Sequence, residues 1–434
     1  MRNDLSRRVL WVHILLLLAL CAVLLRVFWV SQGERYRRAA AAQSRYTLSV
    51  GTVRGNIYDR RLRPLVNAET ETVLCVDPTP AAVTALRQGL PVSRFEEVYP
   101  LLQSGRPILI KSDTAVEGEG ITVLQLPRRY SAAQLAPHII GYIDGEGHGV
   151  CGIEAGYEDK LTRWGGTVTV RYTVNAWRQA TGAAPEVSDT ADHTAGIVLT
   201  LDSELQAIAE REAAALGKGA VVMMEAATGE IRAMASVPDY DVTDVASALS
   251  SVDSPLLNRA TAAWNVGSLF KICVAAAALE NGVEPPEDYC CEGYYRLGDH
   301  SYFCHERGGH GTVGLRQAVE LSCNPYFVEL GQRTGAEALL RMAQRMGFGG
   351  STQLAAGITS AAGTLPALGE TTSGELANLS FGQGKLTATP VQAAVMLAAV
   401  ANGGYAVQPT LLAGESFDGV TVQPAAAGEP IRIM

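Results

Sequence analysis

The chain has 434 residues, of which 47% are hydrophobic and 18% are charged, and its formal net charge at pH 7 is −9. This length is enough for two or three domains. A net negative charge without a basic stripe that alternates with aromatic residues argues against a nucleic-acid partner.

The amino terminus contains one apolar segment long enough to cross a membrane. The run from Val9 to Leu25 has no formal charge when histidine is counted as neutral, and it continues after Arg26, whose side chain can snorkel. We therefore expect a retained anchor over residues 9–30. A cleaved signal peptide is the alternative, because residues 39–42 are alanines. Basic residues lie on both sides of the run: Arg2, Arg7 and Arg8 before it, which favour a cytoplasmic amino terminus, and Arg35, Arg37 and Arg38 after it.

Residues 45–195 mix short β-rich runs with turn residues, which predicts a β-rich domain. The polar stretch over residues 186–195 is expected to be a linker or an exposed crossing. Within this region, the motif over residues 54–60 places an Arg-Asp pair around the apolar Ile57. That arrangement suits a structural strand that crosses between domains, and it does not suit a catalytic site.

The chain beyond residue 195 has an α+β pattern. A strand is predicted over residues 197–201 and a helix over residues 205–216, where apolar side chains recur at helical spacing. Two β-rich runs, 219–225 and 231–236, flank a Thr-Gly turn and predict a hairpin. A further helix is expected to start at Thr389-Pro390 and to run to about Ala401.

Ser268 and Lys271 form the most informative motif, Ser-x-x-Lys. Residues three apart on a helix lie on one face, so Lys271 can take the proton from Ser268, whose alcohol is otherwise a poor nucleophile. The run from Leu269 to Leu279 is apolar apart from Lys271, which predicts a helix buried on all sides, and Asn281-Gly282 supplies its end. Burial lowers the pKa of a lysine. A lysine that acts as a base near pH 7 needs such a lowered pKa, because only its neutral form can accept a proton.

Cys290, Cys291 and Cys304 flank a short loop and predict one disulfide, from Cys304 to Cys290 or Cys291. The alternative is a zinc site made from these three cysteines and His305 or His310. Adjacent cysteines are poorly spaced for tetrahedral ligation, so we expect no metal. Cys21 lies within the membrane segment. Four other cysteines lie in apolar or motif contexts and are predicted to be buried thiols rather than metal ligands: Cys75, Cys151, Cys273 and Cys323.

Ser268-x-x-Lys271 followed by Ser322-Cys323-Asn324 resembles the serine acyl-transfer enzymes, namely penicillin-binding proteins and β-lactamases. The resemblance extends from about residue 50 to residue 410, and it is strongest to class B penicillin-binding proteins, the monofunctional D,D-transpeptidases of elongation, division and sporulation. The segments that carry it are 54–60, 137–142, 152–161, 199–206, 219–222, 228–230, 238–241, 258–260, 382–384 and 389–390.

The third motif of that family, Lys-Thr-Gly, does not occur in these 434 residues, nor does Lys-Ser-Gly. We expect it to be cut off after Met434, in which case the chain as given would be inactive. Arg333-Thr334-Gly335 is not a substitute, because it follows Ser-x-Asn closely in a stretch that predicts helix, turn and helix, with Gly335 as the helix stop.

The resemblance implies a peptidoglycan D,D-transpeptidase that cross-links stem peptides through an acyl-serine intermediate. Ser268 would attack the D-Ala-D-Ala carbonyl with Lys271 as base, Ser322 would relay the proton to the leaving amine, and Asn324 would hold the substrate amide. β-Lactams would acylate the same serine, and no cofactor is implied. The substrate-binding segment would comprise Gly382, Gln383 and Gly384. The rival functions are a non-catalytic envelope scaffold or penicillin sensor, and a β-lactamase, which the anchor and the large pedestal disfavour.

The implied fold class is α+β, with a membrane helix, a β-rich pedestal or dimerisation domain, and an incomplete transpeptidase domain similar to serine β-lactamases. The expected ranges are 1–8 for a cytoplasmic tail, 9–30 for the anchor, 31–195 for the pedestal and 196–434 for the transpeptidase domain. The implied location is the cell membrane, with one span and an extracytoplasmic catalytic domain. A glycosyltransferase or other division or elongation proteins are implied as partners of the pedestal.

Overall fold

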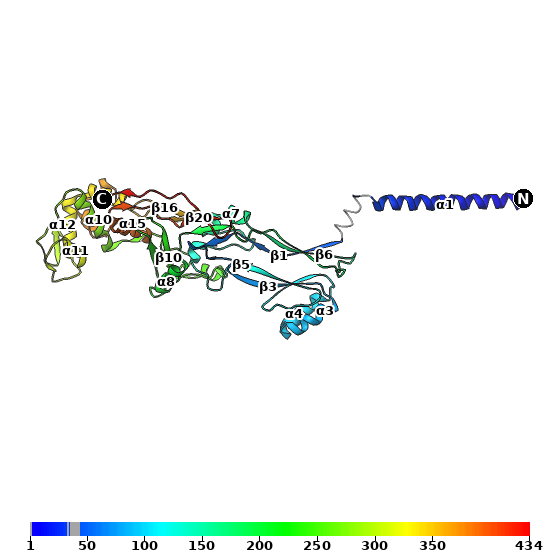
Figure 1. Cartoon of the computed structure of the whole chain (residues 1–434). Coiled ribbons are helices and arrows are strands. Elements are labelled where there is room, and N and C mark those ends of the chain that lie inside the picture. Colours follow the sequence, from blue (N-terminus) through cyan, green and yellow to red (C-terminus); the bar gives the residue numbers. More distant parts are fainter. Residues whose placement is uncertain (1, 33, 35–43) are drawn as a thin grey trace. The chain divides into compact units, whose positions relative to one another are not determined.

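The computed structural model describes residues 2–32, 34 and 44–434, which form two compact units (Figure 1). Unit 1 contains Met1–Val53, Thr70–Pro127 and Gly166–Ala191. Unit 2 contains Arg54–Glu69, Arg128–Gly165 and Asp192–Met434. Two segments of the expected pedestal therefore pack with the carboxyl-terminal part of the chain. The domain boundary expected at residue 195 stays a prediction.

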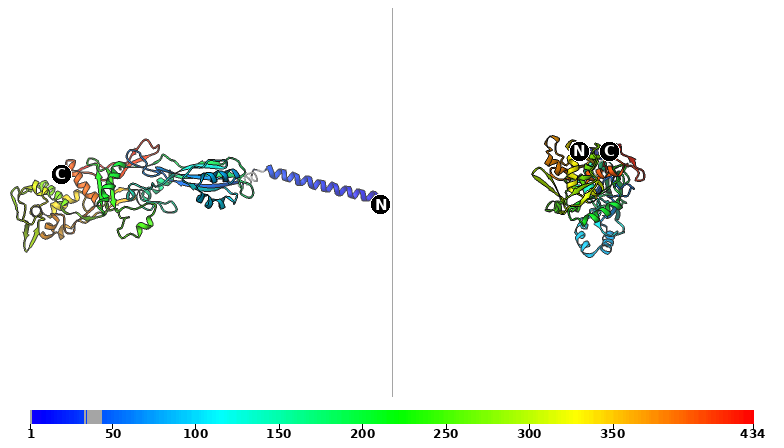
Figure 2. Two further views of the ribbon diagram at one scale, coloured as in Figure 1. Left: turned by 90° about the horizontal axis from the view of Figure 1, so that it is seen from below. Right: turned by 90° about the vertical axis from the view of Figure 1, so that its left-hand side faces the viewer.

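Helix α1 (Arg2–Gln32) is continuous, as Figure 2 shows. An 18-residue window within its segment Arg7–Ser31 has a mean hydropathy of 2.6, and within the described residues this is the one helix long and apolar enough to cross a membrane. This segment contains the span expected over residues 9–30.

Unit 1 is built from two antiparallel sheets and a pair of helices. One sheet has the strand order β1-β6-β7 and the other has the order β4-β3-β5. The elements of this unit after α1 are β1 (Arg45–Val53), β3 (Glu69–Val76), α3 (Pro80–Gly89), α4 (Val92–Leu102), β4 (Ile108–Ser112), β5 (Ile121–Arg128), β6 (Gly166–Thr173) and β7 (Glu186–Asp189).

Strand β3 is buried on both faces, which explains its continuous apolar run. Successive side chains of a strand point to opposite faces. Val73 and Cys75 accordingly pack with side chains of β1 and β6. Leu74 and Val76 pack on the other face, where α3 and α4 contribute their apolar sides. Unit 1 thus has three layers: sheet, sheet and helices.

The segment over residues 186–195, expected to be a linker or an exposed crossing, begins with an exposed strand and then enters unit 2 at Asp192. Strand β7 pairs with β6, with Val187 opposite Val170. Because β7 is an outer strand of its sheet, three of its four residues are exposed and a polar sequence is tolerated there. Polarity alone did not distinguish an exposed edge strand from a loop.

Unit 2 has an α+β architecture, as the sequence predicts. The first elements are β2 (Asn56–Tyr58), α5 (Pro137–Ile140), α6 (Gly152–Gly156), α7 (Glu158–Arg163), β8 (Gly196–Leu199), α8 (Ser203–Ala214), β9 (Gly219–Met224), β10 (Ile231–Val237) and α9 (Val245–Leu249). The middle elements are β11 (Trp264–Asn265), η1 (Gly267–Phe270), α10 (Lys271–Glu280), β12 (Tyr289–Cys291), β13 (Tyr294–Leu297), β14 (His300–Phe303), β15 (Gly311–Val313), α11 (Leu315–Glu320), α12 (Asn324–Thr334) and α13 (Ala336–Arg345). The last elements are β16 (Thr352–Ala355), β17 (Ile358–Ser360), η2 (Leu368–Glu370), α14 (Ser373–Leu379), β18 (Thr387–Ala388), α15 (Pro390–Ala401), β19 (Tyr405–Ala406), β20 (Leu412–Ser416), β21 (Gln423–Pro424) and β22 (Ile431–Arg432).

The motif over residues 54–60 supplies a strand that pairs with a distant part of unit 2. Strand β2 pairs in parallel with β8, with Ile57 opposite Ile197 and fully buried, and β8 pairs antiparallel with β20. Asp59 then receives hydrogen bonds from the backbone N–H and the hydroxyl of Ser203, at 3.2 and 2.8 Å. The motif is therefore a structural element, as expected.

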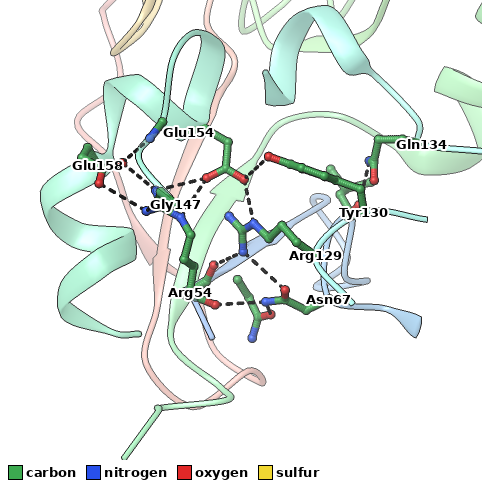
Figure 3. Close-up of polar contacts among 12 residues, drawn as sticks. Arg54, Asn67, Arg129, Tyr130, Gln134, Gly147, Glu154 and Glu158 are labelled. Carbon is green, nitrogen blue, oxygen red and sulfur yellow. Dashed lines mark hydrogen bonds and ion pairs between the residues drawn. The ribbon is translucent and has the colours of Figure 1, made fainter. Parts of the chain in front are cut away.

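A buried charge cluster joins three segments of unit 2 (Figure 3). The fully buried carboxylate of Glu154 accepts hydrogen bonds from Arg54 at 3.2 Å, Arg129 at 2.7 Å and the Tyr130 hydroxyl at 3.1 Å. Arg54 also pairs with Glu158 at 2.7 Å. The two guanidinium groups and two carboxylates balance in charge, which is the condition for keeping such groups out of water.

The helices around α10 form the core beside the Ser-x-x-Lys motif. Phe270, Val274 and Ala277 are fully buried there against side chains of α12 and α13. The expectation that this helix is buried on all sides was wrong at its end, because Leu279 is 57% exposed. The predicted hairpin β9–β10, the strand β8 and the helices α8 and α15 are confirmed.

Candidate active site

Ser268 lies at the start of the central helix of unit 2, on a short 3-10 turn. Strand β11 pairs with β18, and the chain then enters η1, which leads directly into α10. The side chain of Ser268 is exposed, so a substrate can reach its hydroxyl from solvent. The apolar face that fixes the turn begins two residues later, with the fully buried Phe270.

Lys271 lies one turn after Ser268, and its ammonium group is held by four oxygen atoms. Nζ donates to Ser268 Oγ at 3.1 Å and to Asn324 Oδ1 at 2.7 Å. It also contacts both oxygens of Ser322, the carbonyl at 2.7 Å and the hydroxyl at 2.9 Å. The structure thus brings Ser268, Lys271, Ser322 and Asn324 together around one nitrogen atom.

The surroundings of Lys271 favour its neutral form. The residue is only 2% exposed, and the ring of Phe327 lies 5.8 Å from Nζ. Burial lowers the pKa of Lys271 to about 8, against the opposing effect of the nearby thiols of Cys323 and Cys304. With a pKa of about 8, about one tenth of the lysine is neutral at pH 7. In that form the same 3.1 Å contact lets the Ser268 hydroxyl donate to Nζ.

Ser322 and Asn324 flank the start of helix α12. Ser322 has a left-handed backbone with φ 49°, which turns the chain between α11 and α12 and directs its carbonyl at Lys271. Asn324 is the first residue of α12, and its Nδ2 donates to the carbonyl of Phe303 at 3.1 Å. The Ser-x-Asn motif is therefore fixed both by Lys271 and by the end of strand β14.

Gly382, Gln383 and Gly384 form the turn that follows α14. The carbonyl of Gly382 accepts the backbone N–H of Gly267 at 2.9 Å, so this turn lies beside the residue that precedes Ser268. Gln383 and Gly384 line a small cavity together with Glu375, Asn378, Lys385 and neighbouring residues. Their role in substrate binding stays a prediction.

Substitution of Gly382 by alanine should slow the reaction of Ser268. A Cβ at this position would lie 1.7 Å from the Gly267 carbonyl oxygen, so the two turns must separate. A misplacement of about 1 Å costs on the order of 100-fold in rate. Gly335→Ala is the matched control, because it has the same kind of backbone, with φ 82°, but a Cβ there would meet no atom within 4 Å. The measurement is the rate of acylation by a fluorescent penicillin, and equal rates in the two variants would contradict the argument.

Arg333-Thr334-Gly335 has the structural role that the sequence predicts. Helix α12 ends at Thr334, Gly335 has φ 82°, and α13 begins at Ala336. Arg333 forms a surface ion pair with Glu329 one turn earlier in the helix.

The expected disulfide is not formed, because all eight cysteines are free thiols in the structure. Cys290 is exposed, whereas Cys291, Cys304 and Cys323 are buried and lie together with His310. Cys323 was missed as a member of this group, because it lies in a distant segment, just before α12, and was interpreted only as a buried thiol. Its place between Ser322 and Asn324 was the signal that could have linked the group to the Ser-x-Asn motif.

Comparison with known proteins identifies relatives of this chain. Residues 219–431 match the penicillin binding protein transpeptidase domain family. The chain is 32% identical to stage V sporulation protein D of Bacillus subtilis over 358 residues, which cover 78% of this chain and 54% of that protein. The chain spans about half the length of the curated relatives it matches.

Solved structures give the same result. The crystal structure of Pseudomonas aeruginosa PBP2 in complex with WCK 5153 is similar with a TM-score of 0.54 and 31% identity, and the match covers 69% of this chain and 68% of that one. A structure described as the structural coordination of polymerization and crosslinking by a peptidoglycan synthase complex is similar with a TM-score of 0.64 and 25% identity, covering 98% of this chain and 82% of that one. The sequence motifs, the fold and these relatives agree, and the chain therefore belongs to the penicillin-binding proteins, and within them to class B.

Proposed function

We propose that this chain carries the acyl-transfer centre of a peptidoglycan D,D-transpeptidase. The observation that supports this most directly is the contact of 3.1 Å between the buried Lys271 Nζ and the exposed Ser268 Oγ, with Ser322 and Asn324 bonded to the same nitrogen. An exposed alcohol beside a desolvated amine is the arrangement of a serine nucleophile with its own base.

In the first half of the reaction, the neutral Lys271 takes the proton of Ser268 while Oγ attacks the carbonyl carbon of the penultimate D-Ala of a stem peptide. The tetrahedral adduct then collapses with cleavage of the peptide bond. The Ser322 hydroxyl, 2.9 Å from Lys271, passes the proton to the leaving amine, and D-Ala departs. Ser268 is left as an ester of the stem peptide.

In the second half, an amine of a neighbouring stem attacks that ester. A proton returns to Ser268 and a new peptide bond joins the two stems. Asn324 makes one hydrogen bond through each of its polar atoms, to Lys271 and to Phe303. Because an amide side chain can make about four such bonds, Asn324 retains the capacity to hold the substrate amide. β-Lactams, which mimic the scissile amide, acylate the same serine in this proposal.

The location and partners follow from the same proposal. Residues 9–30, within the helical segment Arg7–Ser31, anchor the protein in the cell membrane with one span, with residues 1–8 in the cytoplasm and the catalytic domain outside. Residues 31–195 then form a pedestal that contacts a glycosyltransferase or other division or elongation proteins. A similar chain is part of a peptidoglycan synthase complex, which supports this assignment.

The test is to map the acylated residue and the pH dependence of acylation. Protein expressed from the complete reading frame and purified in detergent should be labelled by a fluorescent penicillin, and mass spectrometry should place the adduct on Ser268. Because the neutral lysine is the reactive form and the pKa of Lys271 is about 8, the acylation rate should rise between pH 6 and pH 9 and level off above its midpoint near 8. An adduct on another residue, or a rate that falls over this range, would overturn the proposal.

A further inference from the structure

Three buried cysteines and a histidine converge next to the Ser-x-Asn motif. The sulfur atoms of Cys291, Cys304 and Cys323 and a ring nitrogen of His310 all lie within 4.8 Å of one another. Each cysteine is at most 2% exposed. We propose that these four residues form a tetrahedral zinc site.

The separations between the four atoms suit one small ion. Zinc binds sulfur at about 2.3 Å and imidazole nitrogen at about 2.0–2.1 Å, so tetrahedral geometry requires ligand atoms about 3.5–3.8 Å apart. Cys304 Sγ and His310 Nδ1 are 3.6 Å apart in the structure. The remaining separations, within 4.8 Å, reach the tetrahedral values with small side-chain rotations. Three cysteines and one histidine are a usual ligand set of closed, structural zinc sites.

The secondary structure explains why these residues meet. Cys291 ends strand β12 and pairs with Gly311 of β15, which brings His310 beside it. Successive side chains of a strand face opposite sides, so Cys291 points inward while the adjacent Cys290 is exposed. The objection that adjacent cysteines cannot share a tetrahedral ion therefore does not apply, since only one of the two faces the cluster.

The other two ligands come from the ends of neighbouring elements. Cys304 follows β14, and its backbone N–H donates to the carbonyl of Gly293 at 2.9 Å. Cys323 immediately precedes α12. The loop between Cys304 and His310 folds closely over Cys291: a Cβ at Gly309 would lie 2.0 Å from the Cys291 carbonyl oxygen, so only glycine fits. The tight loop keeps His310 in reach of the sulfur atoms.

A metal explains this group better than a disulfide does. A disulfide joins only two thiols. If any two of the three cysteines formed one, the third thiol and the ring of His310 would remain buried with no role in that bond. Zinc uses all four groups at once. Zinc also has no redox chemistry of its own, so it does not itself oxidise the thiolates that bind it.

The position of Cys323 gives the site a consequence for catalysis, and this step rests on the proposed function. Cys323 lies between Ser322 and Asn324, which both bind Lys271. Asn324 also binds the carbonyl of Phe303, the residue before Cys304. Two metal ligands thus flank the hydrogen bond that holds Asn324. A bound ion would fix the Ser-x-Asn turn relative to β14, and its loss would loosen the oxygens around Lys271.

The experiment measures metal content in the full chain and in matched variants. Protein purified without chelator and passed through a desalting column should contain about one zinc per chain. Cys291→Ser, Cys304→Ser and His310→Ala should each lower this to less than about one tenth. Cys290→Ser is the matched control, because Cys290 is exposed and lies outside the cluster, and it should retain the zinc of the unaltered protein. His305 Nδ1 lies 3.9 Å from Cys304 Sγ but outside the group of four, so His305→Ala tests whether it replaces His310, and this variant should also retain zinc.

A second measurement on the unaltered protein covers the case in which the variants do not fold. Iodoacetamide applied to the folded protein should leave Cys291, Cys304 and Cys323 unmodified, and addition of a strong chelator should make all three reactive while zinc is released. The chelated protein should also unfold at a lower temperature and be acylated more slowly by penicillin, with both effects reversed by added zinc. If chelation releases zinc and exposes the thiols but leaves acylation unchanged, the metal site stands and its link to the proposed function fails.

Three results would overturn the zinc site: absence of zinc from the unaltered protein, a disulfide between any two of the three cysteines in peptide maps, or full zinc content in Cys304→Ser. Iron in place of zinc would also contradict the assignment.

Discussion

Substitution of Ser268 by alanine should abolish covalent labelling by penicillin. The reaction needs an oxygen nucleophile, and Ser268 Oγ is the exposed hydroxyl held 3.1 Å from the buried Lys271 amine. Without that oxygen no acyl-enzyme can form, so the labelled fraction should fall to background at every penicillin concentration. The measurement is in-gel fluorescence after denaturation, which detects covalent adducts only. Labelling that survives this substitution would remove Ser268 from the mechanism.

Substitution of Lys271 should slow acylation by penicillin nearly as much as substitution of Ser268, for a different reason. Lys271→Ala keeps the nucleophile but removes its base, and a general base contributes on the order of 100- to 10,000-fold in rate. The matched control is Lys218→Ala, because Lys218 is 61% exposed and pairs with Asp253 on the surface of the same unit. Prolonged incubation should still produce some adduct in Lys271→Ala and none in Ser268→Ala, which separates loss of the base from loss of the nucleophile.

The pairing of Ser268 with Lys271 could be predicted from local sequence because it is encoded locally. Ser268 and Lys271 are one helical turn apart, so their spacing alone places them on one face. The hairpin β9–β10, the strand β8 and the helices α8 and α15 were also predictable, since each has a clear apolar period and recognisable end signals. Thr389, for example, both starts α15 and bonds the backbone of Gln392 in a capping box.

The features that could not be predicted depend on contacts between distant segments. Cys323 joins Cys291 and Cys304 only because α12 packs beside the strands β12, β13 and β14, and the apolar periodicity of each element does not reveal this contact between distant segments. The division into two units also depends on contacts between segments that are distant in the sequence. Strand β2 is short and looks like part of the β-rich region before it, yet its partner is β8, so residues 54–69 fold with unit 2.

The buried charge cluster around Glu154 is the feature of unit 2 whose disruption should cost most stability. Glu154 is fully buried, and its two guanidinium partners, Arg54 and Arg129, are 7% and 11% exposed. Glu154→Ala leaves both positive charges and the Tyr130 hydroxyl without this acceptor. Removal of one member of a buried ion pair typically costs about 3–5 kcal/mol in the free energy of unfolding. We expect a loss of this size in Glu154→Ala, measured by urea or thermal unfolding of the purified protein.

Glu158→Ala is the matched control, because it removes the other carboxylate that binds Arg54 but leaves Glu154 in place. Glu158 is 29% exposed, so its loss should cost only about 1 kcal/mol.

The stability difference between Glu158→Ala and the unaltered protein should also depend on pH. The hydrogen bond from Arg54 lowers the pKa of Glu158 from 4.5 to about 2. A carboxylate whose pKa is lowered on folding stabilises the protein above its unfolded pKa, and this contribution is lost as the pH falls toward the folded value. The difference between Glu158→Ala and the unaltered protein should therefore be constant above about pH 5 and shrink between pH 4.5 and pH 2. A loss in Glu154→Ala no larger than that in Glu158→Ala would show that water reaches Arg54 and Arg129, and that the cluster is not buried as the structure describes.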